Sequence, residues 1–132
     1  GLLLYGRTDE REGPRRRAVD AIRELMREVA GVVTGTKGWN AETNRVFAEH
    51  ARAKVAVVSE MVLARWRERT SGREMLEGLA GRVYSSTWAI PDACMPELLA
   101  RSRPCLVALL GDLDRVVEHE ATFTLVTARL PP

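Results

Sequence analysis

The sequence has few cysteines, lysines and histidines, and it has no long apolar run. Its 132 residues include two cysteines, Cys94 and Cys105. Two cysteines are too few for a disulfide framework, and a chain of this length can bury a core without disulfides. We therefore expect both cysteines to be free thiols, small apolar residues of a core, in a reducing compartment that is cytoplasmic or otherwise intracellular.

No apolar run approaches the roughly 20 residues that a membrane-spanning helix needs, so no transmembrane segment is expected. The two histidines, His50 and His119, have no metal-ligand spacing to each other or to an acidic residue. A zinc or di-iron site needs several ligands that converge. We expect no metal and no cofactor, and we expect both histidines at the surface. Since no acid–base or nucleophile–base pair can be placed on one face, we also expect no enzymatic activity.

Apolar residues recur at spacings of three and four in several long segments. This spacing puts an apolar stripe on one face of each helix, and such stripes must be buried against one another. The pattern predicts an all-α fold, a compact bundle of four main helices and one short helix. The stripes are Val19–Ile22–Met26–Val29–Val33, Phe47–Ala51–Val55–Val58–Val62–Trp66, Leu76–Leu79–Val83 with Tyr84, and Leu106–Leu110–Leu113–Val117.

The first two helices are bounded by residues that favour helix ends. Pro14 suits a first helical turn, so the first helix should run from Pro14 to about Val33. Asn40 is a suitable N-cap for a long second helix over 41–69. Apolar residues of this second helix lie on more than one side, which is typical of a central helix packed by several neighbours.

Capping residues also place the later helices. The Ser71–Glu74 segment is a capping box, and it predicts a third helix from 72 to 87 or 88. We expect a short helix over 97–101. Ser102 should then cap a fourth helix, with Pro104 in its first turn, that runs to about Glu120.

The C-terminal tail, residues 121–130, fits two structures. It is rich in β-branched residues, which favours a strand, but its apolar residues also continue the helical step, and we expect a helix. If the tail is a strand, its expected mate is Leu2–Tyr5, which would make a small two-stranded patch pairing the termini. We expect residues 1–13 to form an N-terminal arm and residues 14–132 a single helical-bundle domain.

Arginine outnumbers lysine by eighteen to two. Arginine clusters can neutralise phosphates, so binding of nucleic acid or of an anionic surface is an alternative function. A solvated face with ion pairs is the other explanation, because Asp20, Glu24 and Glu28 are interleaved with the arginines of the first helix. The candidate anion-binding residues are Arg15, Arg16, Arg17, Arg65, Arg67, Arg69 and Arg73.

Large apolar side chains near helix ends suggest binding to a protein. Trp39 and Trp88 lie near predicted helix ends, Met61 lies off the main stripe of the second helix, and Trp66 belongs to that stripe and to the core. Tryptophan is enriched at the centres of interfaces. We expect a non-enzymatic interaction module that binds a protein partner, or itself as a homo-oligomer, through a groove or apolar helix face. Trp39, Trp88 and Met61 are the expected partner-binding residues.

Overall fold

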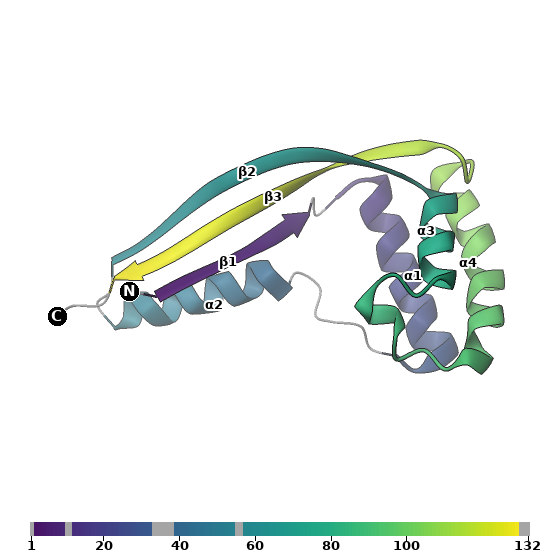
Figure 1. The fold of residues 1–132 in the computed structure, drawn as a ribbon, viewed down its shortest axis with the longest axis horizontal. Coiled ribbons are helices and arrows are strands. Elements are labelled where there is room, and N and C mark those ends of the chain that lie inside the picture. Colours follow the sequence, from purple (N-terminus) through teal and green to yellow (C-terminus); the bar gives the residue numbers. More distant parts are fainter. Residues whose placement is uncertain (1, 10–11, 33–38, 55–56, 130–132) are drawn as a thin grey trace. The chain divides into compact units, whose positions relative to one another are not determined.

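The computed structural model describes residues 2–9, 12–32, 39–54 and 57–129. Three strands and four α-helices are interspersed along these residues (Figure 1). Two short 3-10 turns, η1 and η2, lie between the last two helices. The elements are β1 (Leu2–Asp9), α1 (Pro14–Ala30), α2 (Trp39–Ala53), β2 (Val57–Ser71), α3 (Gly72–Ala80), η1 (Ser85–Thr87), η2 (Asp92–Cys94), α4 (Met95–Leu110) and β3 (Val116–Arg129).

The expected all-α fold is wrong, because three strands form a sheet in the order β1-β3-β2. The chain divides into two compact units. The sheet unit comprises residues 1–10, 36–67 and 120–132, and the helical unit comprises residues 11–35 and 68–119. β2 and β3 therefore each contribute residues to both units.

In the sheet unit, β1 and β3 are antiparallel, with Leu2 opposite Ala128 and Asp9 opposite Ala121. The helix expected over 121–130 is therefore wrong. The tail forms a strand, which was the alternative prediction, and the strand that pairs with it includes the expected segment Leu2–Tyr5. Even-numbered residues of β3 are buried here: Thr124, Val126 and Ala128 are 6%, 1% and 2% exposed. α2 packs on β1 (Figure 1).

The long helix expected over 41–69 is also wrong. α2 ends at Ala53, and the chain continues from Val57 as β2. Valines at 57, 58 and 62 have stiff side chains that fit a pleated strand better than a helix. Their spacing is compatible with both structures, and hydrogen bonding to β3 in the sheet selects the strand.

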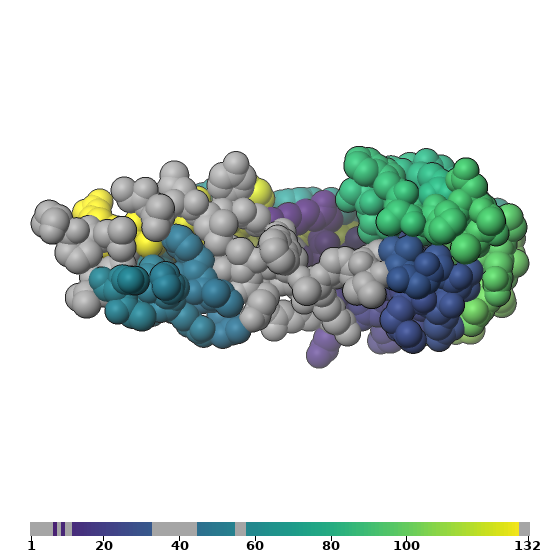
Figure 2. Space-filling view, turned by 90° about the horizontal axis from the view of Figure 1, so that it is seen from below, coloured from purple at the N-terminus to yellow at the C-terminus, as the bar shows by residue number. Residues whose placement is uncertain are grey.

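In the helical unit, α1 and α3 both pack on α4. Figure 2 shows the blue atoms of α1 directly against the green atoms of the α3–α4 segment. Leu98, Ser102, Leu106 and Leu110 of α4 are all 0% exposed. Their spacing of four makes one continuous buried stripe. The separate helices expected over 97–101 and from Ser102 to Glu120 are thus one helix that contains Pro104 and ends at Leu110.

Two of the predicted helix ends are confirmed. α1 begins at Pro14, as predicted. It ends at Ala30, earlier than the expected Val33, because Gly31 adopts the left-handed conformation (φ 65°) with its N–H bonded to Arg27 O at 2.9 Å. Ser71 caps α3, because its hydroxyl accepts a hydrogen bond of 3.2 Å from the Glu74 amide. α3 itself ends at Ala80, earlier than predicted.

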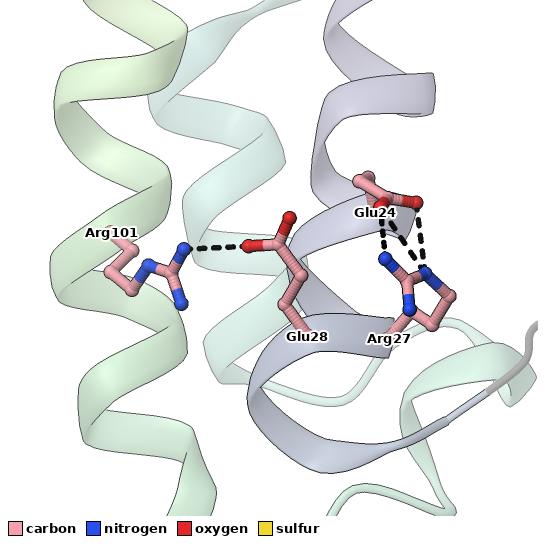
Figure 3. A network of polar contacts seen from close by, with 4 residues as sticks. All are labelled: Glu24, Arg27, Glu28 and Arg101. Carbon is pink, nitrogen blue, oxygen red and sulfur yellow. Dashed lines mark hydrogen bonds and ion pairs between the residues drawn. The ribbon is translucent and has the colours of Figure 1, made fainter.

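Ion pairs join the helices at the surface (Figure 3). The Arg101 guanidinium of α4 lies 2.6 Å from a carboxylate oxygen of Glu28 on α1. Glu24 and Arg27 pair along α1 itself, one turn apart. Such exposed pairs stabilise a fold only slightly, so the buried apolar stripes supply most of the cohesion between the helices.

Candidate functional site

Exposed apolar residues lie close together in the sequence at one place in each unit. In the sheet unit they are Met61, Val62, Leu63 and Ala64, which we call the β2 edge patch. In the helical unit they are Val83, Tyr84 and Trp88, which we call the Trp88 loop. Contiguous exposed apolar residues of this kind mark interaction surfaces more often than scattered ones do.

The β2 edge patch is apolar on both faces of its strand. Successive residues of a strand point to opposite faces, so Met61 and Leu63 lie on one face, and Val62 and Ala64 lie on the other. Met61, Val62 and Leu63 are 60%, 42% and 49% exposed. Neither face of β2 is therefore covered at these positions, although one face is normally buried in a globular sheet.

The backbone of β2 is also open to a partner. β2 is an outer strand of the sheet, and no strand within the described ranges pairs with its outer side. An outer strand presents a row of N–H and C=O groups that another strand can pair with. Natural proteins usually protect such edges with charged residues or proline, but residues 61–64 contain neither.

Charged residues lie directly beyond each end of the patch. Glu60 precedes it, and Arg65 follows it; both are exposed. The half-buried Trp66 comes next, with the guanidinium of Arg7 stacked 5.6 Å from the centre of its ring. The apolar centre of the edge thus has an acidic end and a basic end.

The Trp88 loop is shaped by the way in which α3 ends. Arg82 is the only non-glycine residue of the described ranges with a positive φ, at 53°. The amide of Val83 bonds to Gly78 O at 3.0 Å, and the amide of Arg82 bonds to Leu79 O at 3.2 Å. These are the two hydrogen bonds of a Schellman motif, in which glycine usually occupies the left-handed position.

The side chain of Arg82 holds the loop together. Its guanidinium donates 2.8 Å bonds to the carbonyls of Thr87 and Ile90, and it pairs with Asp92 at 2.7 Å. The indole N–H of Trp88 donates to Arg82 O at 3.1 Å. Trp88 is therefore anchored at its nitrogen while it remains 70% exposed, which suits a rigid contact residue.

The predicted partner-binding residues belong to different units. Met61 lies in the β2 edge patch, on a strand and not on the expected helix face. Trp39 is the first residue of α2 in the same unit, and its side chain lies outside the described part of the structure. Trp88 belongs to the helical unit. Neither unit contains all three of the predicted partner-binding residues.

Five exposed residues of the two surfaces were not predicted as contact residues. Val62, Val83 and Tyr84 lie on expected core stripes, whereas Leu63 and Ala64 belong to no stripe. Val83 and Tyr84 are 69% and 56% exposed, because α3 ends before them. For Val62 and Leu63 the useful signal is the run of apolar residues from 61 to 64, which fits a strand as well as a helix.

The first arginine cluster, Arg15–Arg17, lies in the first turns of α1. Arg16 pairs with Asp20 at 3.2 Å, one turn along the helix, and Arg15 is also engaged in an interaction. Arg17 is exposed. This cluster therefore lies on a helix surface that carries ion pairs. Such a surface is the predicted alternative to anion binding.

The second arginine cluster is divided between the units. Arg65 and Arg67 are exposed on β2 in the sheet unit, and Arg67 has an interaction partner. In the helical unit, Arg69 lies 3.6 Å from Glu118. Arg73 binds Asp114 through two hydrogen bonds of 2.6 and 3.1 Å. Carboxylates thus already neutralise two of these four guanidinium groups.

The histidines and cysteines of the described ranges lie in different surroundings. His119 is buried, unlike the surface position expected, and its Nε2 lies 3.3 Å from Glu68 Oε2, while His50 is exposed. Cys94 and Cys105 are free and half-buried. Within the described ranges, no group of three or more histidine, cysteine or acidic side chains is arranged to hold a metal ion.

Among the described residues, none of the helices has the length and apolar character to cross a membrane. No model of a known protein family matches the sequence, and no curated protein is similar to it at a significant level.

Proposed function

We propose that this chain is a non-enzymatic interaction module that binds an extended polypeptide segment along the outer edge of β2. One observation carries the proposal: β2 is an outer strand, and its residues 61–64 are exposed and apolar on both faces. An added strand would pair with the backbone of β2, and its side chains would lie beside those of β2 on both faces. This recognition by strand addition takes its affinity from main-chain hydrogen bonds and its specificity from alternate side chains.

The proposal changes the predicted mode of binding but keeps the predicted class of partner. The partner is a protein, and Met61 is the predicted contact residue that lies on the edge. Trp88 offers a separate contact point in the helical unit. The free cysteines, Cys94 and Cys105, suit the reducing, intracellular compartment that we propose for the protein.

A displayed library of random twelve-residue peptides, selected on the full chain, tests this function. We expect selected peptides to bind at least tenfold more weakly to Leu63→Lys, because a lysine at the edge introduces a charge into the apolar contact. Val107→Lys is the matched control, since Val107 is 40% exposed on α4 and Leu63 is 49% exposed on β2. It should leave peptide binding unchanged.

Amide hydrogen exchange then locates the bound peptide. Peptide binding should slow exchange of every second β2 amide between Met61 and Ala64, because the added strand bonds only to the N–H groups that point away from β3. Peptides that bind without any dependence on Leu63 and without protecting β2 would contradict strand addition at this edge.

The alternative function, binding of nucleic acid or an anionic surface, would use the arginine clusters. Arg17 and Arg65 are exposed and favour it, whereas the pairs Arg16–Asp20 and Arg73–Asp114 weaken it. Fluorescent single- and double-stranded nucleic acid, titrated at two salt concentrations, separates the two functions. Tight binding with a steep salt dependence that Arg17→Ala and Arg65→Ala reduce would favour the alternative.

A further inference from the structure

We infer that the segment bound by the β2 edge carries acidic residues followed by apolar residues, at alternate positions, and runs antiparallel to β2. This inference rests on the proposed function and names the chemistry of the partner. It follows from the order of side chains along one face of β2 within the sheet unit. On that face, Met61 and Leu63 are followed by Arg65 and Arg67.

These four side chains share a face because they lie two positions apart along a strand. All four are exposed, so this face of the edge is apolar in one half and basic in the other. The opposite face has a different order. Val62 and Ala64 are exposed there, and the charged residue of that face is Glu60, which precedes them. The acidic and basic ends of the edge therefore lie on different faces.

The basic half of this face is complementary to an acidic partner. In paired strands, residues directly opposite one another lie on the same face, where unlike charges stabilise the pair and like charges destabilise it. Carboxylates opposite Arg65 and Arg67 meet this condition. Arg67 already has an interaction partner, but a guanidinium has five N–H donors and can bind more than one acceptor. Acidic residues alone would leave Met61 and Leu63 uncovered, so the partner needs apolar residues as well.

The direction of the bound segment decides the order of its residues. An antiparallel strand that begins opposite Arg67 reaches Arg65 next on this face, and then Leu63 and Met61. Its order from the N-terminus is therefore acidic, acidic, apolar, apolar, with one residue between successive members. A parallel strand would need the reverse order. We expect the antiparallel direction because antiparallel pairing is slightly more stable per residue, and because β1 and β3 of the same sheet are antiparallel.

The other face adds a condition at the far end of the segment. The residue opposite Glu60 comes directly after the residue opposite Met61, and a lysine there would face the carboxylate of Glu60. The sequence Glu-Thr-Glu-Thr-Leu-Thr-Leu-Lys, which we call the acidic–apolar peptide, meets all of these conditions. Threonine favours strands, and it lies opposite Trp66, Ala64 and Val62 in this register.

Titration of the full chain with the acidic–apolar peptide, both ends blocked and followed by NMR, measures the affinity. We expect binding at least about threefold tighter than that of the same peptide with glutamine in place of both glutamates. The reversed sequence has the same composition and charge and should also bind more weakly. Added salt should weaken binding of the acidic–apolar peptide, because the ion pairs are exposed. Tighter binding of the reversed sequence would overturn the antiparallel direction.

An exchange of charges tests the register. Arg65→Glu should weaken binding of the acidic–apolar peptide at least about fivefold, because like charges then face each other. Lysine at the third position of the peptide should restore binding to this variant and weaken binding to wild type. Arg103→Glu makes the same change of charge at an exposed arginine of α4, and as the matched control it should leave both affinities unchanged. Circular dichroism confirms that each variant is folded, and failure of the lysine peptide to restore binding would overturn the register.

The outcomes separate this inference from the proposed function. If peptides selected from the library bind through Leu63 but carry no acidic residues and are unaffected by Arg65→Glu, the partner chemistry is wrong and strand addition stands. If no peptide binds through Leu63, both are wrong. Acidic peptides that depend on Arg65 and not on Leu63 would show a surface for anions in general, which overturns the inference and the proposed function together.

Discussion

Arg73 and Asp114 are joined by two hydrogen bonds, from Nε to Oδ1 at 2.6 Å and from Nη2 to Oδ2 at 3.1 Å. Beside them, the amide of Arg73 bonds to the carbonyl of Leu113 at 2.9 Å. The first turn of α3 is thereby attached to the loop between α4 and β3. The hydrogen bond from Arg73 lowers the pKa of Asp114, and the same bond raises the pKa of Arg73.

The first prediction concerns the pH dependence of this pair. Because the pKa of Asp114 is lower in the folded chain, its stabilising contribution is present above the ordinary value of 3.8 and is lost as pH falls through the folded pKa. Arg73→Ala should raise the pKa of Asp114 towards 3.8, as measured by NMR of the carboxyl carbon. The difference in unfolding free energy between wild type and variant should shrink at acid pH. Arg103→Ala, which removes an exposed arginine of α4, should leave the pKa of Asp114 unchanged.

Removal of the Ser71 cap should destabilise the helical unit. The Ser71 hydroxyl accepts a bond from the Glu74 amide, so Ser71→Ala leaves that donor without its acceptor. We expect a loss of about 1 kcal/mol in the free energy of urea unfolding. Ser71→Thr retains the acceptor and should recover most of the loss. Equal stability of Ser71→Ala and wild type would show that the cap contributes nothing.

The same substitution at Ser102 should have the opposite sign. The Ser102 hydroxyl is buried in α4, and within the described residues it has no hydrogen-bond partner. Ser102→Ala therefore removes an unsatisfied polar group and introduces a better helix former. We expect unfolding to cost about 0.5 kcal/mol more in the variant than in wild type. A clear loss of stability would reveal a partner for this hydroxyl.

Neighbouring residues of α4 should differ sharply in their response to truncation. Leu106 is 0% exposed in the core of the helical unit, whereas Val107 is 40% exposed. Leu106→Ala should lower the free energy of unfolding by about 2–5 kcal/mol, through lost burial and the cavity that remains. Val107→Ala should change it by less than about 0.5 kcal/mol. Similar losses of unfolding free energy for the two variants would indicate that a different face of α4 is buried.

Gly78 and Tyr84 should be energetically coupled. A Cβ atom on Gly78 would lie 2.8 Å from Tyr84 Cε2, which is closer than contacts of real side chains. In a Tyr84→Ala background, Gly78→Ala should stabilise the chain by about 0.5 kcal/mol, because alanine is the better helix former. In the wild-type background the gain should be smaller or reversed, as the ring must move. A double-mutant cycle measured by urea unfolding checks this, and additive effects would contradict the contact.

The elements that sequence patterns predicted correctly are those whose local and tertiary preferences agree. α1 has a proline at its start, a left-handed glycine after its end and one apolar stripe, and all three signals specify the same helix. The Ser71 cap is a contact between residues three positions apart, so it is visible without knowledge of the fold.

The surfaces were predicted less well than the helices, for a physical reason. Exposure of Val83 depends on the end of α3 at Ala80 and on the left-handed Arg82 beyond it, whose guanidinium bonds to the carbonyls of Thr87 and Ile90. Exposure of Leu63 depends on the place of β2 at the edge of the sheet. Neither property follows from the apolar pattern around the residue itself.

The sequence by itself determined several features of the helical unit: the start of α1, the cap of α3 and the second half of the buried stripe of α4, Leu106 and Leu110. Each of these depends on side chains within a few turns of one another. Only the tertiary structure decided that residues 57–71 and 116–129 are strands. Their period suits a helix and a strand alike, and hydrogen bonds between segments far apart in the chain, such as Leu2–Asp9 and β3, settle the choice.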